Sequence, residues 1–131
     1  MSKIHLCLRV MDPFDVMMVV LRFNERINAR DLGGLVEMMT EDHFFVDSGG
    51  DRDDDMEKGW RDFFERFPDY RNVFTRVQAE GDSVSIAGYS VCSYEPLDGP
   101  ALWSARVRDG LVSEWRVHKD TPENRESLKL M

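Results

Sequence analysis

The spacing of apolar residues changes along the chain, and this change restricts the fold more than any other feature. Before residue 70, apolar side chains recur every three or four positions, as on one face of a helix. From Tyr70 onward they alternate with polar side chains, as in half-buried strands. The sequence therefore predicts helices in the first half and an antiparallel meander in the second, which is an α+β fold.

The predicted helices have recognisable starts and ends. They span residues 12–29, 32–39 and 56–67, with a short polar helix at 121–128. Asp12 and Pro13 form a start signal, because the aspartate accepts from unpaired amides and the proline has no N–H to leave unpaired. The third helix has an aromatic stripe that usually marks a core, while Trp60 or Phe64 could also line a ligand cavity.

Strands are predicted over residues 43–47, 72–80, 83–94, 102–108 and 111–119. Asp109-Gly110 between the last two is a strong hairpin signal. Residues 1–11 are expected to form a leader, either a short edge strand or a disordered segment. Residues 12–131 are expected to form a single domain, because a chain of 131 residues suits one hydrophobic core.

Charge and cysteine content limit the possible partners and the cellular location. The chain has 17 basic and 25 acidic residues and a net charge of −8, which disfavours nucleic acid and anionic membranes. A small molecule or another protein is the expected partner. Two cysteines without a paired motif, and no secretory apolar segment, favour a reduced cytoplasmic setting. The longest apolar run is too short to cross a bilayer.

The segment Glu41–Gly50 contains the first candidate site. In an extended strand, His43, Phe45 and Asp47 point to one side. Asp47 is the candidate general base, and the alternative is a strand-end turn in which it accepts from the amides of the following glycines. His43 could orient Asp47, act as a base itself, or lie at the rim.

Other polar groups have less specific patterns. Asp51, Asp53 and Asp55 have calcium-loop spacing, but Met56 occupies the position that requires glycine, so a solvated loop explains them better. Cys92 lies in a strand with no histidine or lysine near it in sequence, which favours an inert buried thiol. The histidines and cysteines lack metal-site spacing, so we expect no metal and no cofactor.

Three segments carry a family resemblance. Leu21–Gly50 (LRFNERINARDLGGLVEMMTEDHFFVDSGG) is similar to ketosteroid isomerases, and DMEKGWRDFFERFPDYRNVF and GLVSEWRVHKDTPENR resemble the SnoaL-like branch of the nuclear transport factor 2 superfamily. The resemblance implies a cone-shaped fold, with a curved antiparallel sheet around about three helices. It also implies a deep, mostly apolar pocket for a small hydrophobic molecule.

The resemblance also implies site residues. Asp47 falls at the position of the isomerase general base. Phe23 and Trp103 stand where the isomerases place the tyrosine and aspartate of the oxyanion hole. Phenylalanine cannot donate a hydrogen bond and an indole does not titrate, so standard steroid isomerisation is not expected.

In the family frame, one side of the last strand faces the cavity. That side carries Glu114, Arg116 and His118, which makes Arg116 and His118 catalytic candidates beside Asp47. The alternative is a mutually satisfied Glu114–Arg116 pair. Trp115 and Val117 would then face outward, and a homodimer through the outer sheet face would cover them. The expected substrate-binding residues are Phe23, His43, Phe45, Trp60, Phe64, Trp103 and Glu114.

Three functions are consistent with the sequence. The first is a cofactor-free acid–base enzyme, an isomerase, cyclase or hydratase/hydrolase, acting on a hydrophobic substrate with Asp47 as base. The second is a protein that binds such a ligand without turnover. The third is a dimeric interaction module that uses the outer sheet face, and it is compatible with either of the others.

Overall fold

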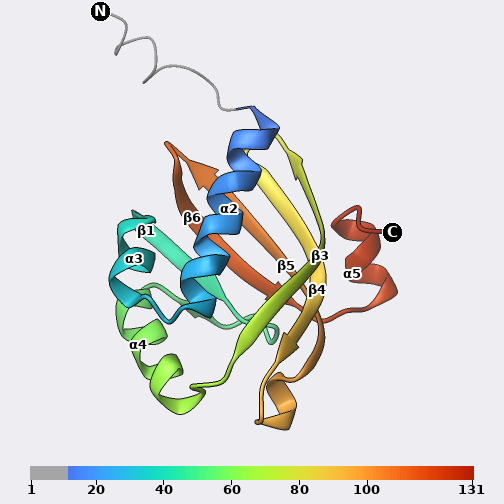
Figure 1. Ribbon diagram of the computed structural model, residues 1–131. Coiled ribbons are helices and arrows are strands. Elements are labelled where there is room, and N and C mark those ends of the chain that lie inside the picture. The colour runs from blue at the N-terminus through green and yellow to red at the C-terminus, as the bar shows by residue number, and fades with distance from the viewer. Residues whose placement is uncertain (1–11) are drawn as a thin grey trace, which may run out of the picture.

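A bent six-stranded sheet wraps around one long helix (Figure 1). The computed structural model describes residues 12–131. Helix α2 (Pro13–Asn28) lies across one face of the sheet, which we call the inner face (Figure 1). Helices α3 (Leu32–Glu37) and α4 (Met56–Arg66) follow on the same side, while α5 (Pro122–Ser127) lies apart from them. The fold is α+β, as the sequence predicts.

Each helix begins after a side chain that accepts a hydrogen bond from a first-turn amide. Asp12, Asp31, Asp55 and Thr121 cap α2, α3, α4 and α5 in this way. These amides have no partner within the helix, so each cap stabilises the start by about 1 kcal/mol. The predicted starts of the first and third helices are therefore confirmed by their caps.

The sheet is mixed rather than purely antiparallel. Its strands are β1 (Met39–Val46), β2 (Arg52–Asp53), β3 (Arg71–Glu80), β4 (Ser83–Val91), β5 (Gly99–Arg108) and β6 (Leu111–His118), with a short 3-10 turn, η1 (Glu95–Leu97), before β5. The order is β2-β1-β6-β5-β4-β3, and β3 to β6 form the predicted antiparallel meander. β1 pairs with β6 in parallel. β1 begins at Met39 rather than His43, and β5 at Gly99 rather than Leu102.

The side of β6 that faces the core is the reverse of the one predicted. In the ladder with β5, Trp115 lies opposite Ala105 and Val117 opposite Trp103. Trp115 is 1% exposed, and its ring centroid lies 4.9 Å from that of Phe23 on α2. Burying these apolar groups stabilises the fold by about 25 cal/mol per Å², whereas burying the charges on the other side would cost several kcal/mol. Trp115 and Val117 therefore do not form an outer apolar surface.

The C-terminal segment covers part of the outer face. Leu130 is fully buried against Ala87 and Leu102, and the Arg76 guanidinium donates to the Leu130 and Met131 carbonyls at 3.2 and 2.8 Å. The predicted leader, residues 1–11, lies outside the described residues. Within residues 12–131, no helix is long and apolar enough to cross a membrane.

Candidate functional site

A cavity of about 510 Å³ lies between the inner sheet face, α4 and the segment around η1. Its wall is mostly aromatic and apolar, with Phe45, Met56, Trp60, Phe63, Trp103 and Trp115 among the lining residues. Its polar groups include Asp47, Asp53, Tyr70, Ser90, Asp98 and Lys119. An apolar cavity of this size with a few polar groups suits a small organic molecule.

Asp47 lies in the cavity wall just after β1. Its Oδ1 accepts from the backbone amides of Gly49 and Asp51, at 2.8 and 3.0 Å. The strand-end turn left open by the sequence is therefore present, with Asp51 as the second donor. Among residues 12–131, no donor bonds to Oδ2, so that oxygen is left for a ligand or a proton.

Three of the predicted binding residues, Phe45, Trp60 and Trp103, line the cavity. They come from β1, α4 and β5. The Phe45 and Trp60 rings meet edge to face with centroids 6.2 Å apart. The indole nitrogens of Trp60 and Trp103 are buried and have no acceptor among residues 12–131.

Phe23, His43 and Phe64 do not line the cavity, which corrects the prediction for them. Phe23 on α2 is fully buried against Trp115, and Phe64 stacks on Trp60 with centroids 5.5 Å apart. His43 is 5% exposed, and its Nδ1 donates to the Val112 carbonyl at 2.7 Å. Burial lowers the pKa of His43, so the ring stays neutral at neutral pH and is part of the buried core.

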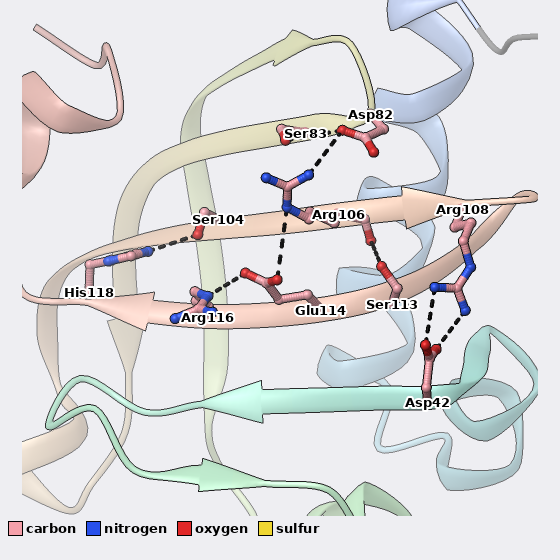
Figure 2. Close-up of polar contacts among 10 residues, drawn as sticks. All are labelled: Asp42, Asp82, Ser83, Ser104, Arg106, Arg108, Ser113, Glu114, Arg116 and His118. Carbon is pink, nitrogen blue, oxygen red and sulfur yellow. Dashed lines mark hydrogen bonds and ion pairs between the residues drawn. The ribbon is translucent and has the colours of Figure 1, made fainter.

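Glu114, Arg116 and His118 point away from α2, on the outer face of the sheet (Figure 2). Arg116 Nε donates to Glu114, which is the mutual pair that the sequence left open. His118 Nε2 lies 2.8 Å from Ser104 Oγ, and His118 is the one residue of these three that lines the cavity. The prediction that these residues form the cavity wall is therefore wrong for Glu114 and Arg116, because the cavity-facing side of β6 carries Trp115 and Val117.

Lowering the pH from about 7.5 to about 5 is expected to reduce the free energy of unfolding. Burial lowers the pKa of His43 and of His118 below 6.5, and the Arg116 charge adds to the effect at His118. The unfolded chain therefore takes up protons first, and stability present above pH 6.5 is lost as the pH falls toward the folded pKa values. His43 contributes at most about 1.4 kcal/mol per pH unit, and the half-exposed His118 less.

Urea unfolding at several pH values measures this dependence. The variant His118→Gln is the control, and it should keep most of the slope because His43 is the more buried of the two. A free energy of unfolding that is flat or rises as the pH falls would contradict the burial of His43 as a neutral ring.

Sequence reasoning missed a buried polar chain at the cavity wall. Tyr70 OH lies 3.1 Å from Ser90 Oγ, which lies 3.0 Å from Asn72 Oδ1, and Asn72 Nδ2 donates to Asn24 Oδ1 at 3.2 Å. Burial raises the pKa of Tyr70, so its hydroxyl stays protonated at neutral pH. Asn72 shares the inward side of β3 with Phe74, and a polar residue among inward apolar ones is a weak sign of a buried hydrogen-bonded group that does not identify its partners.

The acidic loop before α4 has structural roles. Asp55 caps α4, and Asp53 Oδ1 accepts from the Asp55 amide at 2.9 Å while Asp53 also lines the cavity. Within residues 12–131, no three His, Cys, Asp or Glu side chains come together in a way that could hold a metal ion.

A bent sheet wrapped around helices, with an aromatic cavity on its inner face, is the architecture of the nuclear transport factor 2 superfamily. The chain belongs to the SnoaL-like domain family within it, because the family model matches residues 20–115, more than half of the sequence. A comparison with curated proteins finds no significant match.

Solved structures share the fold at low identity. An LEH-like epoxide hydrolase from M. tuberculosis is 17% identical over 90% of this chain and 92% of that one, with a TM-score of 0.72. A candidate polyketide cyclase from Sinorhizobium meliloti is 14% identical over 82% and 100%, with a TM-score of 0.71. A candidate ketosteroid isomerase from Kribbella flavida is 20% identical over 89% of both chains, with a TM-score of 0.69. At these identities the similarity shows the fold alone.

Proposed function

We propose that the protein binds a small hydrophobic molecule in this cavity and that Asp47 acts on it as a general base. The reaction is an isomerisation, cyclisation or hydration/hydrolysis that needs no cofactor. One observation carries the proposal: Asp47 lies in the wall of an aromatic cavity, with Oδ1 held by two amides and no donor on Oδ2 among residues 12–131. The solved relatives with names of isomerase, cyclase and hydrolase type support this range of reactions.

The two amide hydrogen bonds fix the orientation of the carboxylate. A base must lie within hydrogen-bond reach of the proton it removes, and a fixed carboxylate keeps that geometry in every turnover. The aromatic rings that line the same cavity, among them Phe45, Trp60 and Trp103, shield the apolar part of the bound molecule from water. Arg116 and His118 have no part in this step, since their side chains lie on the outer face.

Binding without turnover is the second candidate function. It is favoured by the residues at the two oxyanion-hole positions, because Phe23 is buried away from the cavity and the Trp103 indole nitrogen is covered. No titrating donor therefore comes from either position to stabilise an enolate. The distinction between the candidates depends on whether a proton is moved.

A ligand screen followed by an isotope measurement tests the proposal. Thermal-shift screening of terpenoid, steroid and polyketide-like compounds identifies molecules that raise the melting temperature. Bound carbon acids are then followed by NMR in D₂O, where a base exchanges the acidic C–H for deuterium. Protein-dependent exchange supports catalysis. Tight binding without exchange or conversion would favour the binding protein instead.

We also propose a homodimer through the outer sheet face, on different residues from those first expected. Tyr89 and Val91 on β4 alternate with the inward Ser90 and are 42% and 45% exposed. An exposed apolar pair on a sheet face is suited to a two-fold contact. Sedimentation at tens of micromolar should show a dimer, and Tyr89→Glu should shift it to monomer. A wild-type monomer under these conditions would rule this interface out.

A further inference from the structure

We propose that Tyr70 presents a hydrogen-bond acceptor to the cavity, so that the ligand carries a hydroxyl or N–H donor at that end. The inference rests on the proposed function, since it assumes that the cavity holds a small organic molecule. It specifies a chemical class within that proposal: a hydrophobic molecule with a phenol, alcohol or amine group, rather than an ether, ketone or carboxylate, against Tyr70.

Tyr70, Ser90, Asn72 and Asn24 form the buried polar chain, and α2 holds its far end in place. Asn28 Nδ2 donates to the Asn72 carbonyl and Asn28 Oδ1 accepts from the Asn72 amide, both at 2.9 Å. These two bonds fix the Asn72 backbone. Its side-chain Nδ2 donates to Asn24 Oδ1 at 3.2 Å, and both side chains are buried, with residue exposures of 3% and 8%. The side-chain oxygen of Asn72, Oδ1, is therefore the atom turned toward Ser90.

Counting protons gives the direction of the rest of the chain. Asn72 Oδ1 has no hydrogen, so the single hydroxyl proton of Ser90 donates to it at 3.0 Å. Ser90 then has only lone pairs for its second partner, and the Tyr70 hydroxyl donates to Ser90 Oγ at 3.1 Å. A phenol also has a single proton. What Tyr70 has left for the cavity is the lone pair of its oxygen.

The carboxylates of the cavity, Asp98 among them, have the same hydrogen-bonding character, whereas Ser48, His118 and Lys119 also line it and can donate. Asp47 and Asp53 line it as carboxylates, which accept only. The indole N–H groups of Trp60 and Trp103 are covered and offer no donor. Among the cavity-lining residues within 12–131, Lys119 is the only cation, and it is exposed at the mouth. A ligand acceptor placed at Tyr70 would face a lone pair, whereas a ligand donor would be matched there.

Four naphthalene probes of similar size test the assignment. 2-Naphthol offers a donor, 2-methoxynaphthalene and 2-acetonaphthone offer only acceptors, and 2-naphthoate adds a negative charge. Calorimetric titration of the full chain should show 2-naphthol binding about 10-fold or more tightly than the ether or the ketone, and 2-naphthoate weakest, because a matched hydrogen bond is worth about 1–1.5 kcal/mol. Tyr70→Phe should reduce the preference for 2-naphthol to about 2-fold.

The variant Ser90→Ala distinguishes a Tyr70 hydroxyl that donates to Ser90 from one that accepts from it. Without Ser90 Oγ, the Tyr70 proton loses its acceptor at 3.1 Å and can turn to the cavity, so the ketone and ether should gain affinity relative to wild type. Ser104→Ala, which removes a serine hydroxyl on the outer face, is the matched control and should leave all four affinities unchanged. Wild-type protein that prefers the ketone, and loses that preference in Tyr70→Phe, would show that the chain runs from Asn72 to Tyr70 and overturn the proposal.

An NMR measurement without ligand reads the direction independently. The Tyr70 hydroxyl proton, held against Ser90, should exchange slowly with water in wild type and rapidly in Ser90→Ala. Rapid exchange in wild type would overturn the assignment. Probes that bind without preference would overturn the Tyr70 assignment alone, while failure of every probe to bind would overturn the small-molecule cavity and the ligand class together.

Discussion

Replacing Trp115 with glutamate is expected to unfold the domain. Trp115 is 1% exposed, and its ring lies against Phe23 and Phe74 at centroid distances of 4.9 and 6.4 Å. Truncating such a ring costs about 3–5 kcal/mol, and a buried, unpaired carboxylate adds several more. Because a domain of this kind has about 5–15 kcal/mol of stability, the variant should lack a cooperative unfolding transition. Circular dichroism during urea titration measures this.

The neighbouring residue supplies the control for this prediction. Arg116→Gln changes the opposite side of the same strand, where the guanidinium is partly solvated. Glu114 keeps a second cationic neighbour in this variant, because its Oε1 lies 3.9 Å from Arg106 Nε. Its free energy of unfolding should stay within about 1 kcal/mol of wild type. If Trp115→Glu gave a folded monomer from a wild-type dimer, Trp115 would have to be an interface residue rather than a core residue.

The helices and the hairpins could be predicted because their signals are local. Asp12 and Pro13 start α2 as their chemistry requires, and the Asp109-Gly110 turn has the positive φ angles, 55° and 78°, that this dipeptide favours. A cap or a tight turn depends on a few adjacent residues, so the sequence alone contains the necessary information.

The inward side of β6 could not be obtained in the same way. Alternation separates Glu114 and Arg116 from Trp115 and Val117 without saying which side meets the core. The register with β5 and the parallel pairing with β1 decide it, and both depend on contacts far apart in sequence. The apolar side faced inward, as the hydrophobic effect favours, and the resemblance to a family with polar cavity groups pointed the other way.

The two parts of the cavity site differ in how well the sequence predicts them, because one depends on local contacts and the other on distant ones. Asp47 could be located from a strand that ends in glycines, and the turn that holds it uses residues within four positions. The chain of Tyr70, Ser90 and Asn72 joins β3 to β4, and its far end reaches α2. Only the tertiary structure brings these hydroxyl and amide groups together, so their sequence positions gave no indication of a shared role.

Changing Asp47 to asparagine is expected to remove proton transfer while leaving binding intact. Asparagine keeps the oxygen that accepts from the Gly49 and Asp51 amides, so the turn and the cavity shape persist. It cannot take a proton at neutral pH, and loss of a general base lowers turnover about 10²- to 10⁴-fold. Deuterium exchange or turnover of the ligand found by screening measures the loss, and ligand affinity should stay within about 3-fold.

Asp53→Asn is the matched control, because Asp53 is a second carboxylate in the cavity wall whose Oδ1 also accepts a backbone amide. If Asp47 is the base, Asp53→Asn should keep turnover within about 3-fold of wild type. Equal losses in both variants would assign the effect to the negative potential of the cavity rather than to proton transfer at one residue. Unchanged turnover in Asp47→Asn would end the base assignment, whereas a wild-type protein that binds its ligand and moves no proton would make binding the better account of this cavity.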